Sequence, residues 1–156
     1  MKYVIIVIII LVLIGLIIFL PNIIKKNYKI ENINYFYLIY TRGYASNCNV
    51  LYRIDNDLKA TIKLYGKSEE VTINVDKSVL KEIEEVLVKY DVQKWNGFNK
   101  KNNMVNDGDS FDLNIEMENG KKIEADGYAS WPKNYSEVIN ELDEIFLRIY
   151  SEDKGD

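Results

Sequence analysis

The sequence has no histidine and a single cysteine, Cys48, among its 156 residues. Zinc sites built from Cys and His side chains are therefore excluded, and so are catalytic nucleophiles that need a neighbouring histidine as a base. A disulfide within the chain is impossible because it needs two cysteines. We accordingly expect no catalytic residue, no metal and no cofactor, and we expect that the protein is not an enzyme.

Acidic residues outnumber basic residues outside the N-terminal segment. The chain carries 20 Lys and Arg residues against 24 Asp and Glu residues. Three of the lysines and none of the acids lie in residues 1–27, so the remainder has 17 basic and 24 acidic side chains and a formal charge of −7. Nucleic acids repel a domain of this charge. Nucleic-acid binding is therefore not expected.

Charged and strongly polar residues are also missing from the stretch between Tyr3 and Leu20, which reads YVIIVIIILVLIGLIIFL. As a helix, this stretch rises about 27 Å, close to the thickness of the hydrocarbon core of a bilayer. A cleaved signal peptide usually has a shorter apolar run, of about 7–15 residues, and ends at a cleavage site with small residues. Here Pro21 and Asn22 follow instead, with no nearby cysteine for lipid attachment. We expect a retained transmembrane helix.

The charges that flank this segment give conflicting predictions of its orientation. Lys2 precedes it, whereas Lys25, Lys26 and Lys29 follow it. Counting positive charges places the C-terminal part in the cytoplasm. The very short N-terminal flank is instead the usual layout of a bacterial signal-anchor, and we adopt the extracytoplasmic orientation. We expect a single-pass protein of the cell membrane, with its anchor and juxtamembrane segment in residues 1–27 and one soluble domain in residues 28–156.

Six stretches after the anchor have the apolar alternation or the β-branched and aromatic residues of strands. In the clearest of them, Leu58, Ala60, Ile62 and Leu64 are predicted to face inward, and Thr61 to face solvent. Asn119-Gly120 predicts a type I′ hairpin between the last two strands. The predicted strands are 33–42, 50–55, 58–65, 71–75, 110–118 and 121–127.

Two stretches have the three- and four-residue apolar spacing of amphipathic helices. The first begins after Asp76 or Ser78, either of which can cap it, and continues to Tyr90. The second begins after Asn134, which is predicted to form a capping box with Glu137, and gives way to a frayed tail at 151–156. The residues at 99–106 are predicted to be a polar loop. The expected fold is α+β, a mainly antiparallel sheet with two helices on one face.

Two groups of carboxylates are candidates for chemistry. Residues 107–112 (DGDSFD) have the oxygen ligands that calcium prefers. The EF-hand pattern fails, however, so we interpret them as a turn in which Asp109 or Ser110 bonds to the local backbone. Glu116 and Glu118 share a strand face, and Glu124 and Asp126 are predicted to lie across from them. Such pairs can hydrolyse glycosides, but on the polar side of a hairpin they are more typical of a solvated face.

Aromatic residues are concentrated in loops and at the ends of predicted elements. Such residues either form contact surfaces or close the open ends of a small sheet core. The sequence leaves both interpretations open. The loop aromatics are Tyr44, Trp95, Phe98, Tyr128 and Trp131. If the domain has a binding site, we expect it at Trp95, Asp107, Tyr128 and Trp131.

Several short motifs occur in a fixed order between residues 50 and 150. They are Trp95-Asn96-Gly97-Phe98, then Asp107-Gly108-Asp109-Ser110-Phe111, then Gly127-Tyr128 with Pro132-Lys133-Asn134-Tyr135. As a set they resemble a family of small bacterial single-pass membrane proteins and lipoproteins that has no assigned activity. This chain departs from the lipoprotein members because no cysteine follows its apolar run. The resemblance supports the domain boundary and implies no mechanism.

These observations favour a non-enzymatic domain that binds a protein or a cell-envelope component. Two alternatives remain. An inhibitor or immunity-type protein at the membrane would fit the acidic charge, since many such targets are basic. A carboxylate-based hydrolase of envelope glycans would use the hairpin acids described above.

Overall fold

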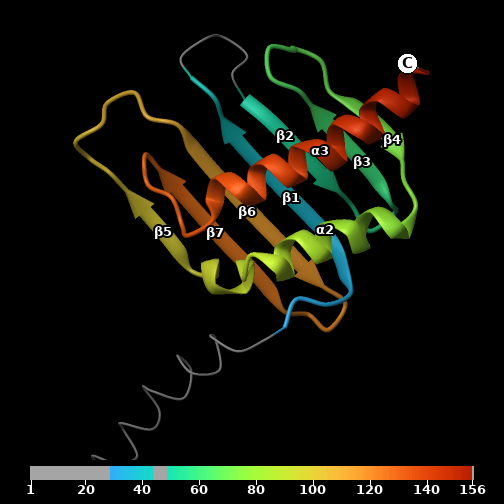
Figure 1. The fold of residues 1–156 in the computed structure, drawn as a ribbon, viewed down its shortest axis with the longest axis horizontal. Coiled ribbons are helices and arrows are strands. Elements are labelled where there is room, and N and C mark those ends of the chain that lie inside the picture. Colours follow the sequence, from blue (N-terminus) through green and yellow to red (C-terminus); the bar gives the residue numbers. More distant parts are fainter. Residues whose placement is uncertain (1–28, 44–48, 156) are drawn as a thin grey trace, which may run out of the picture.

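Alternating apolar residues build one seven-stranded sheet with two α-helices, and the predicted α+β class is confirmed (Figure 1). The computed structural model describes residues 29–43 and 49–155. The predicted transmembrane helix at residues 3–20 lies outside these ranges. The strands are β1 (Ile33–Thr41), β2 (Asn49–Ile54), β3 (Lys59–Lys63), β4 (Val71–Asn74), β5 (Phe98–Lys101), β6 (Ser110–Met117) and β7 (Lys122–Tyr128). The helices are α2 (Lys77–Lys89), the short 3-10 helix η1 (Val92–Trp95) and α3 (Tyr135–Lys154).

β1 occupies the centre of the sheet. The strand order is β4-β3-β2-β1-β6-β7-β5, and each neighbouring pair is antiparallel except β7 and β5. The chain builds one half of the sheet from β1 to β4, crosses a face as α2 and reaches the opposite edge at β5 (Figure 1). It then returns to the centre with β6, and after β7 it crosses back over the same face as α3.

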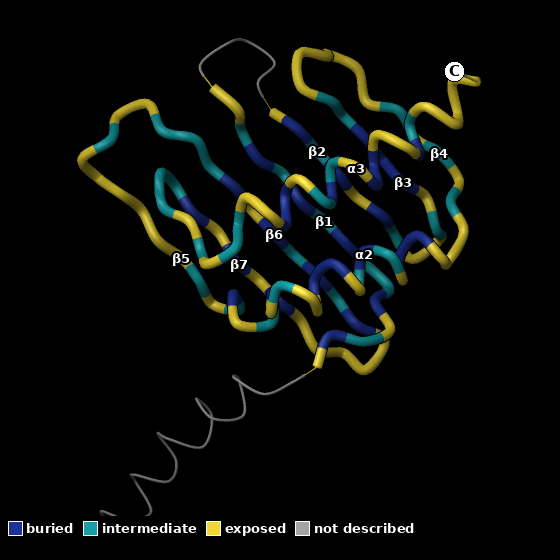
Figure 2. Tube along the Cα trace, viewed as in Figure 1, coloured by how far each residue is buried: buried dark blue, intermediate teal, exposed yellow. Residues whose placement is uncertain are grey.

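Both helices cover one face of the sheet, as predicted (Figures 1 and 2). On β1, Phe36, Leu38 and Tyr40 point towards the helices and are at most 2% exposed. The residues between them lie on the uncovered face and are half-buried. One expectation for that face is wrong: Thr61 is buried, and its hydroxyl accepts a hydrogen bond at 2.9 Å from the guanidinium of Arg53, its partner across β2 and β3.

An aromatic stack joins α3 to the middle of the sheet. The Phe146 ring lies 4.2 Å from the Tyr52 ring on β2, nearly parallel to it at 4°, and 5.8 Å from the Phe36 ring on β1. All three side chains are at most 2% exposed. The apolar stripe of α3 therefore packs closely against β1 and β2, the first two strands in the sequence.

The hairpin between β6 and β7 forms at Asn119-Gly120, but not as the predicted type I′ turn. Gly120 has a φ of 78°, whereas Asn119 is not among the residues with positive φ. The Gly120 amide donates to the Met117 carbonyl at 2.8 Å, and the Met117 amide donates to the Lys121 carbonyl at 3.0 Å. This is the three-residue hairpin in which a glycine follows a type I turn.

Two elements were missed in the region after α2. Residues 92–95 form η1, and Phe98–Lys101 form β5, which pairs in parallel with β7. Three of the four β5 residues are exposed, so the strand lacks the alternation that identifies a half-buried strand from sequence. The predicted polar loop therefore begins only after Lys101.

At the ends of the helices, one prediction is confirmed and two are wrong. Asp76 caps α2 by accepting a hydrogen bond from the Ser78 amide at 2.8 Å, as expected. Asn134 does not form the predicted capping box: its backbone is left-handed at a φ of 62°, and its side chain makes no cap hydrogen bond. The predicted frayed tail is also wrong, since α3 continues to Lys154 and ends at Gly155 with a φ of 73°.

The aromatic stack gives a direct test of the fold. Phe146→Ala should lower the free energy of unfolding by about 3–5 kcal/mol, because it leaves a cavity between Phe36 and Tyr52. Leu147→Ala is the matched control: its side chain is 46% exposed on the same helix, and its effect should stay within about 0.5 kcal/mol. Urea unfolding of the full chain measures both. Equal effects of the two substitutions would contradict the stack.

Candidate functional site

The candidate site lies where β1 ends and β6 begins. The Asp109 carboxylate accepts a hydrogen bond from the Gly43 amide at 2.8 Å, and the Thr41 hydroxyl accepts one from the Ser110 amide at 2.7 Å. The Ala129 amide donates to the Asp109 carbonyl at 2.8 Å. Asp109 therefore joins three segments that are far apart in the sequence, and it does not make the local turn that we predicted for it.

Tyr128 holds the loop before β6 against the loop after β7. Its hydroxyl accepts a hydrogen bond from the Gly108 amide at 2.9 Å and donates one to the Asn106 carbonyl at 2.6 Å. Gly108 must be a glycine here, because an added Cβ would lie 2.6 Å from the Cβ of Ala129. Asp107 is exposed between these contacts. Two of the four predicted site residues, Asp107 and Tyr128, are thus brought together at this end of the sheet.

Five rings form an aromatic cluster under these loops: Trp95, Phe98, Phe111, Trp131 and Tyr135. Phe111 on β6 lies at its centre, 4.9 Å from Tyr135, 5.9 Å from Trp131 and 6.3 Å from Trp95 between ring centroids. Trp131 stacks on Tyr135 at 4.6 Å with an angle of 27° between the rings. The two interpretations of the loop aromatics therefore apply to different residues, since Trp95 is 4% exposed and Trp131 is 41% exposed.

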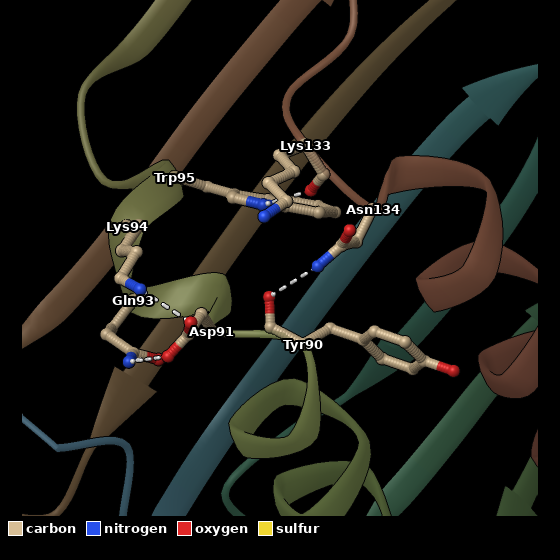
Figure 3. Close-up of polar contacts among 7 residues, drawn as sticks. All are labelled: Tyr90, Asp91, Gln93, Lys94, Trp95, Lys133 and Asn134. Carbon is tan, nitrogen blue, oxygen red and sulfur yellow. Dashed lines mark hydrogen bonds and ion pairs between the residues drawn. The ribbon is translucent and has the colours of Figure 1, made fainter.

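Trp95 supports the loop that carries Trp131 (Figure 3). Its indole Nε1–H donates to the Lys133 carbonyl at 3.0 Å. The Asn134 side-chain amide donates to the Tyr90 carbonyl at 3.4 Å, which joins the end of α2 to the start of α3. Figure 3 shows that Trp95, Lys133 and Asn134 converge from η1 and from the segment that precedes α3. Trp95, a predicted contact residue, acts as a buried support.

A surface pocket of about 260 Å³ opens beside Trp131. Its apolar wall includes the two stacked rings, and its polar wall comes from the end of β1, the start of β6 and the first turns of α3. We name it the distal pocket, because β1 places it about 27 Å from Ile33, where the chain enters the sheet. The side chains that define it are Arg42, Asp109, Trp131, Tyr135, Ser136 and Asn140.

A carboxylate on α3 anchors the floor of this region. Asp143 accepts hydrogen bonds from the Tyr52 hydroxyl at 2.8 Å, from the Tyr40 hydroxyl and, on its other oxygen, from the Arg42 guanidinium at 2.6 Å. Its side chain is 13% exposed. Burial raises the pKa of both tyrosines well above the ordinary value, and the neighbouring Asp143 charge raises it further. The hydroxyls therefore remain protonated donors and the carboxylate the acceptor.

Burial likewise raises the pKa of Tyr135, and the nearby Asp109 charge acts in the same direction. A phenol that stays protonated offers a donor as well as an acceptor to the pocket wall.

The pocket also contains Arg42, Ser136 and Asn140, which no pattern in the sequence indicated. One signal was present in the sequence: Asp143 sits next to the apolar stripe of the last helix, where a carboxylate needs a partner.

The hairpin acids do not form the predicted facing pairs. Glu116 lies across from Lys122 and forms an ion pair with it. Glu124 lies across from Asn114, and Glu118 lies beyond the end of β6. Glu116 and Glu124 therefore lie diagonally on the same face, with Lys122 directly opposite Glu116.

One pair of acids does face each other. Asp126 lies directly across from Asp112 on the uncovered face. Burial raises the pKa of Asp112, and the charges of Asp126 and Glu124 raise it further. Within residues 29–43 and 49–155, no group of three or more His, Cys, Asp or Glu side chains is arranged to hold a metal ion.

Removing the Asp143 carboxylate should destabilise the protein strongly. Asp143→Ala leaves two buried tyrosine hydroxyls and a guanidinium without their acceptor, which should cost about 3–5 kcal/mol. Glu144→Ala changes the exposed neighbouring carboxylate and should stay within about 0.5 kcal/mol. Urea unfolding of the full chain compares the two variants. A loss below about 1 kcal/mol for Asp143→Ala would contradict the role of this network.

The raised pKa values predict a loss of stability at alkaline pH. In the unfolded chain tyrosine loses its proton near pH ~10. Tyr40, Tyr52 and Tyr135 keep theirs to higher pH when folded, so stability is complete below about pH 10 and falls above it, by up to about 1.4 kcal/mol per pH unit for each tyrosine. The midpoint of urea unfolding between about pH 9 and pH 11 measures this decrease. Tyr52→Phe should make it shallower, and a midpoint that is constant over this range would contradict the prediction.

No family model and no curated protein matches the chain. In the part of the chain that the structure describes, no helix is long and apolar enough to cross a membrane. The function is therefore inferred from the geometry of the distal pocket.

Proposed function

We propose that the protein is a single-pass membrane protein whose extracytoplasmic domain is a non-enzymatic binding module, with the distal pocket as its contact site. The observation that carries this proposal is the combination of an exposed, rigidly supported tryptophan with hydrogen-bonding side chains in one pocket. Exposed aromatic residues held in place by packing are typical of binding sites.

The position of the pocket supports the same proposal. The chain enters the sheet at the beginning of β1, and the pocket lies at the other end of that strand. If residues 3–20 anchor the protein, the pocket lies at the end of the domain opposite to the strand end that follows the anchor in sequence, and a component of the cell envelope can reach it. The acidic charge of residues 28–156 also disfavours close contact with anionic lipid headgroups.

The chemistry of the pocket favours binding over catalysis. The half-buried carboxylate of Asp143 already accepts three hydrogen bonds, and the Asp109 carboxylate in the pocket wall accepts one from the Gly43 amide. The tyrosine hydroxyls beside Asp143 have raised pKa values, so they are poor bases at neutral pH. The side chains that remain accessible, such as Trp131, Ser136 and Asn140, are suited to contact and orientation.

An inhibitor of a basic enzyme or toxin is a second candidate, favoured by the net charge of −7 outside residues 1–27. Electrostatic attraction would accelerate its association with a basic target. On this alternative, the rate of binding to the target would fall steeply with salt concentration, whereas contacts within the distal pocket would depend on salt only weakly.

Lysine labelling of intact cells tests both the side of the membrane and the occupancy of the pocket. Lys133 is exposed next to Trp131, and Lys67 is exposed in the turn between β3 and β4. A membrane-impermeant amine reagent should label both residues in cells. Lys133 lies outside the pocket lining but only two residues after Trp131. The ratio of Lys133 to Lys67 labelling should be lower in cells than in the purified full chain, because a bound envelope component that covers Trp131 and extends along this loop shields Lys133.

The control variant is Trp131→Ala, which should restore the ratio measured for the purified chain. Absence of labelling at both lysines in intact cells would overturn the extracytoplasmic orientation. An equal ratio in cells and in the purified chain would overturn the occupancy of the distal pocket. This readout does not depend on the chemical nature of the occupant.

A further inference from the structure

We propose that the distal pocket binds one ring of a neutral saccharide, which stacks on the Trp131 indole while Arg42, Asp109 and Asn140 hydrogen-bond its hydroxyl groups. This inference rests on the proposed function and specifies its ligand class. It is carried by four properties of the pocket: its aromatic platform, the polar groups around it, its charge and its size.

The platform is a flat apolar surface fixed in one orientation. Trp131 is 41% exposed, while its inner side is held by Tyr135 at 4.6 Å and by Phe111 at 5.9 Å. The loop that carries it is fixed in turn by the hydrogen bond from Trp95 to Lys133. A sugar ring has a flat face of C–H groups that fits such a platform, and a rigid aromatic side chain loses little entropy on binding.

The polar groups around the platform match hydroxyl groups, which both donate and accept hydrogen bonds. Arg42 supplies donors only, Asp109 supplies acceptors only, and Asn140 and Ser136 supply both. They come from the residue that follows β1, from the loop before β6 and from α3, so they surround the platform from different elements. A purely apolar ligand would leave these groups desolvated without partners.

The charge of the pocket disfavours ionic ligands. The Arg42 guanidinium is paired with Asp143 at 2.6 Å, and Asp109 lies in the same pocket wall. A phosphate or carboxylate would approach the Asp109 carboxylate, and the one cation in the wall, Arg42, is already paired with Asp143. A cation would in turn approach the half-exposed Arg42. A neutral ligand with many hydroxyl groups avoids both repulsions.

The volume of about 260 Å³ falls just below the range of about 300–1,000 Å³ that is typical of drug-sized ligands. This pocket therefore has room for one ring, whose neighbours in a longer glycan would extend over the surface. Two other pockets have volumes of about 260 Å³ and 350 Å³, but charged, amide, serine and aliphatic side chains line them, with no aromatic side chain. Size alone therefore does not select the distal pocket.

Nuclear magnetic resonance of the full chain tests the proposal, because the chain has only two tryptophans. The ¹⁵N-labelled protein is studied in micelles of a detergent without a sugar headgroup and is titrated with an N-acetylglucosamine tetramer and with a glucose tetramer. At least one of them should shift the indole N–H signal of Trp131 in a saturable way, with a Kd that is expected near about 1 mM for a single-ring site. The charged comparison ligands are inorganic phosphate, an anion, and Nα-acetyl-lysine amide, a cation. Both should leave the indole signal of Trp131 unchanged.

Three variants locate the effect. Trp131→Ala should weaken saccharide binding at least about ten-fold, as expected for a central aromatic contact. Asn140→Ala should weaken it about five-fold through a lost hydrogen bond, and alanine is well tolerated in a helix. Tyr65→Ala removes an exposed aromatic residue, 51% exposed, outside the pocket, and should leave the affinity unchanged. Because Trp131→Ala lacks the indole signal, saccharide binding to this variant is measured from the shifts of its backbone amide signals.

The results separate this inference from the function on which it rests. Saturable shifts that depend on Trp131 and Asn140 would support saccharide binding. Lys133 protection in cells together with no response to either saccharide, or with a response only to phosphate or to the lysine amide, would overturn the ligand class and leave the binding module intact. Absence of Lys133 protection together with no saccharide response would overturn both.

Discussion

The carboxylate of Asp143 is the constraint on which the arrangement of this domain depends. It is the only acid on α3 that is hydrogen-bonded to both β1 and β2 among the described residues, and its three donors come from Tyr40, Arg42 and Tyr52. A buried carboxylate is stable only where such donors converge. The rotation of α3 about its axis is therefore fixed by polar contacts, and the apolar stripe adds the packing around Phe146. Because Ser136 and Asn140 lie on the same helix, this rotation also determines the positions of their side chains in the wall of the distal pocket.

Much of the fold could be predicted because the relevant signals are local. Alternation, or a concentration of β-branched and aromatic residues, identified six of the seven strands, and the two amphipathic stripes identified both α-helices. The strand β5 was missed because its pairing with β7 depends on a parallel register that residues 98–101 do not encode by alternation. The start of α3 was misread for a related reason. Asn134 follows a capping pattern, but its side chain is directed to the Tyr90 carbonyl by contacts between the two helices.

The candidate site was harder to predict because its residues meet only through the sheet. Trp131, Tyr128 and Asp107 were selected as loop residues, and the structure brings them to one end of the domain. Trp95 was selected for the same reason and is a buried support. Arg42 and Asp143, which are separated by 101 residues, gave no joint signal, since nothing in the sequence relates the end of the first strand to the middle of the last helix. Periodicity in the sequence identifies helices and strands. The residues of a pocket, in contrast, are brought together only by the spatial order of the strands in the sheet.

The parallel edge strand β5 has a consequence wherever identical molecules are packed side by side at high density. An outer strand exposes unpaired backbone groups, which in a two-dimensional layer of identical molecules would meet the same groups of a neighbour again and again. Here that strand ends in Lys100 and Lys101, whose ammonium groups lie over the rings of Phe98 and Tyr128 at 5.4 Å and 5.3 Å. These two positive charges on the β5 edge of one molecule repel the same two charges on the β5 edge of another. Lateral crowding would then favour dispersion of the molecules over their growth into a continuous sheet.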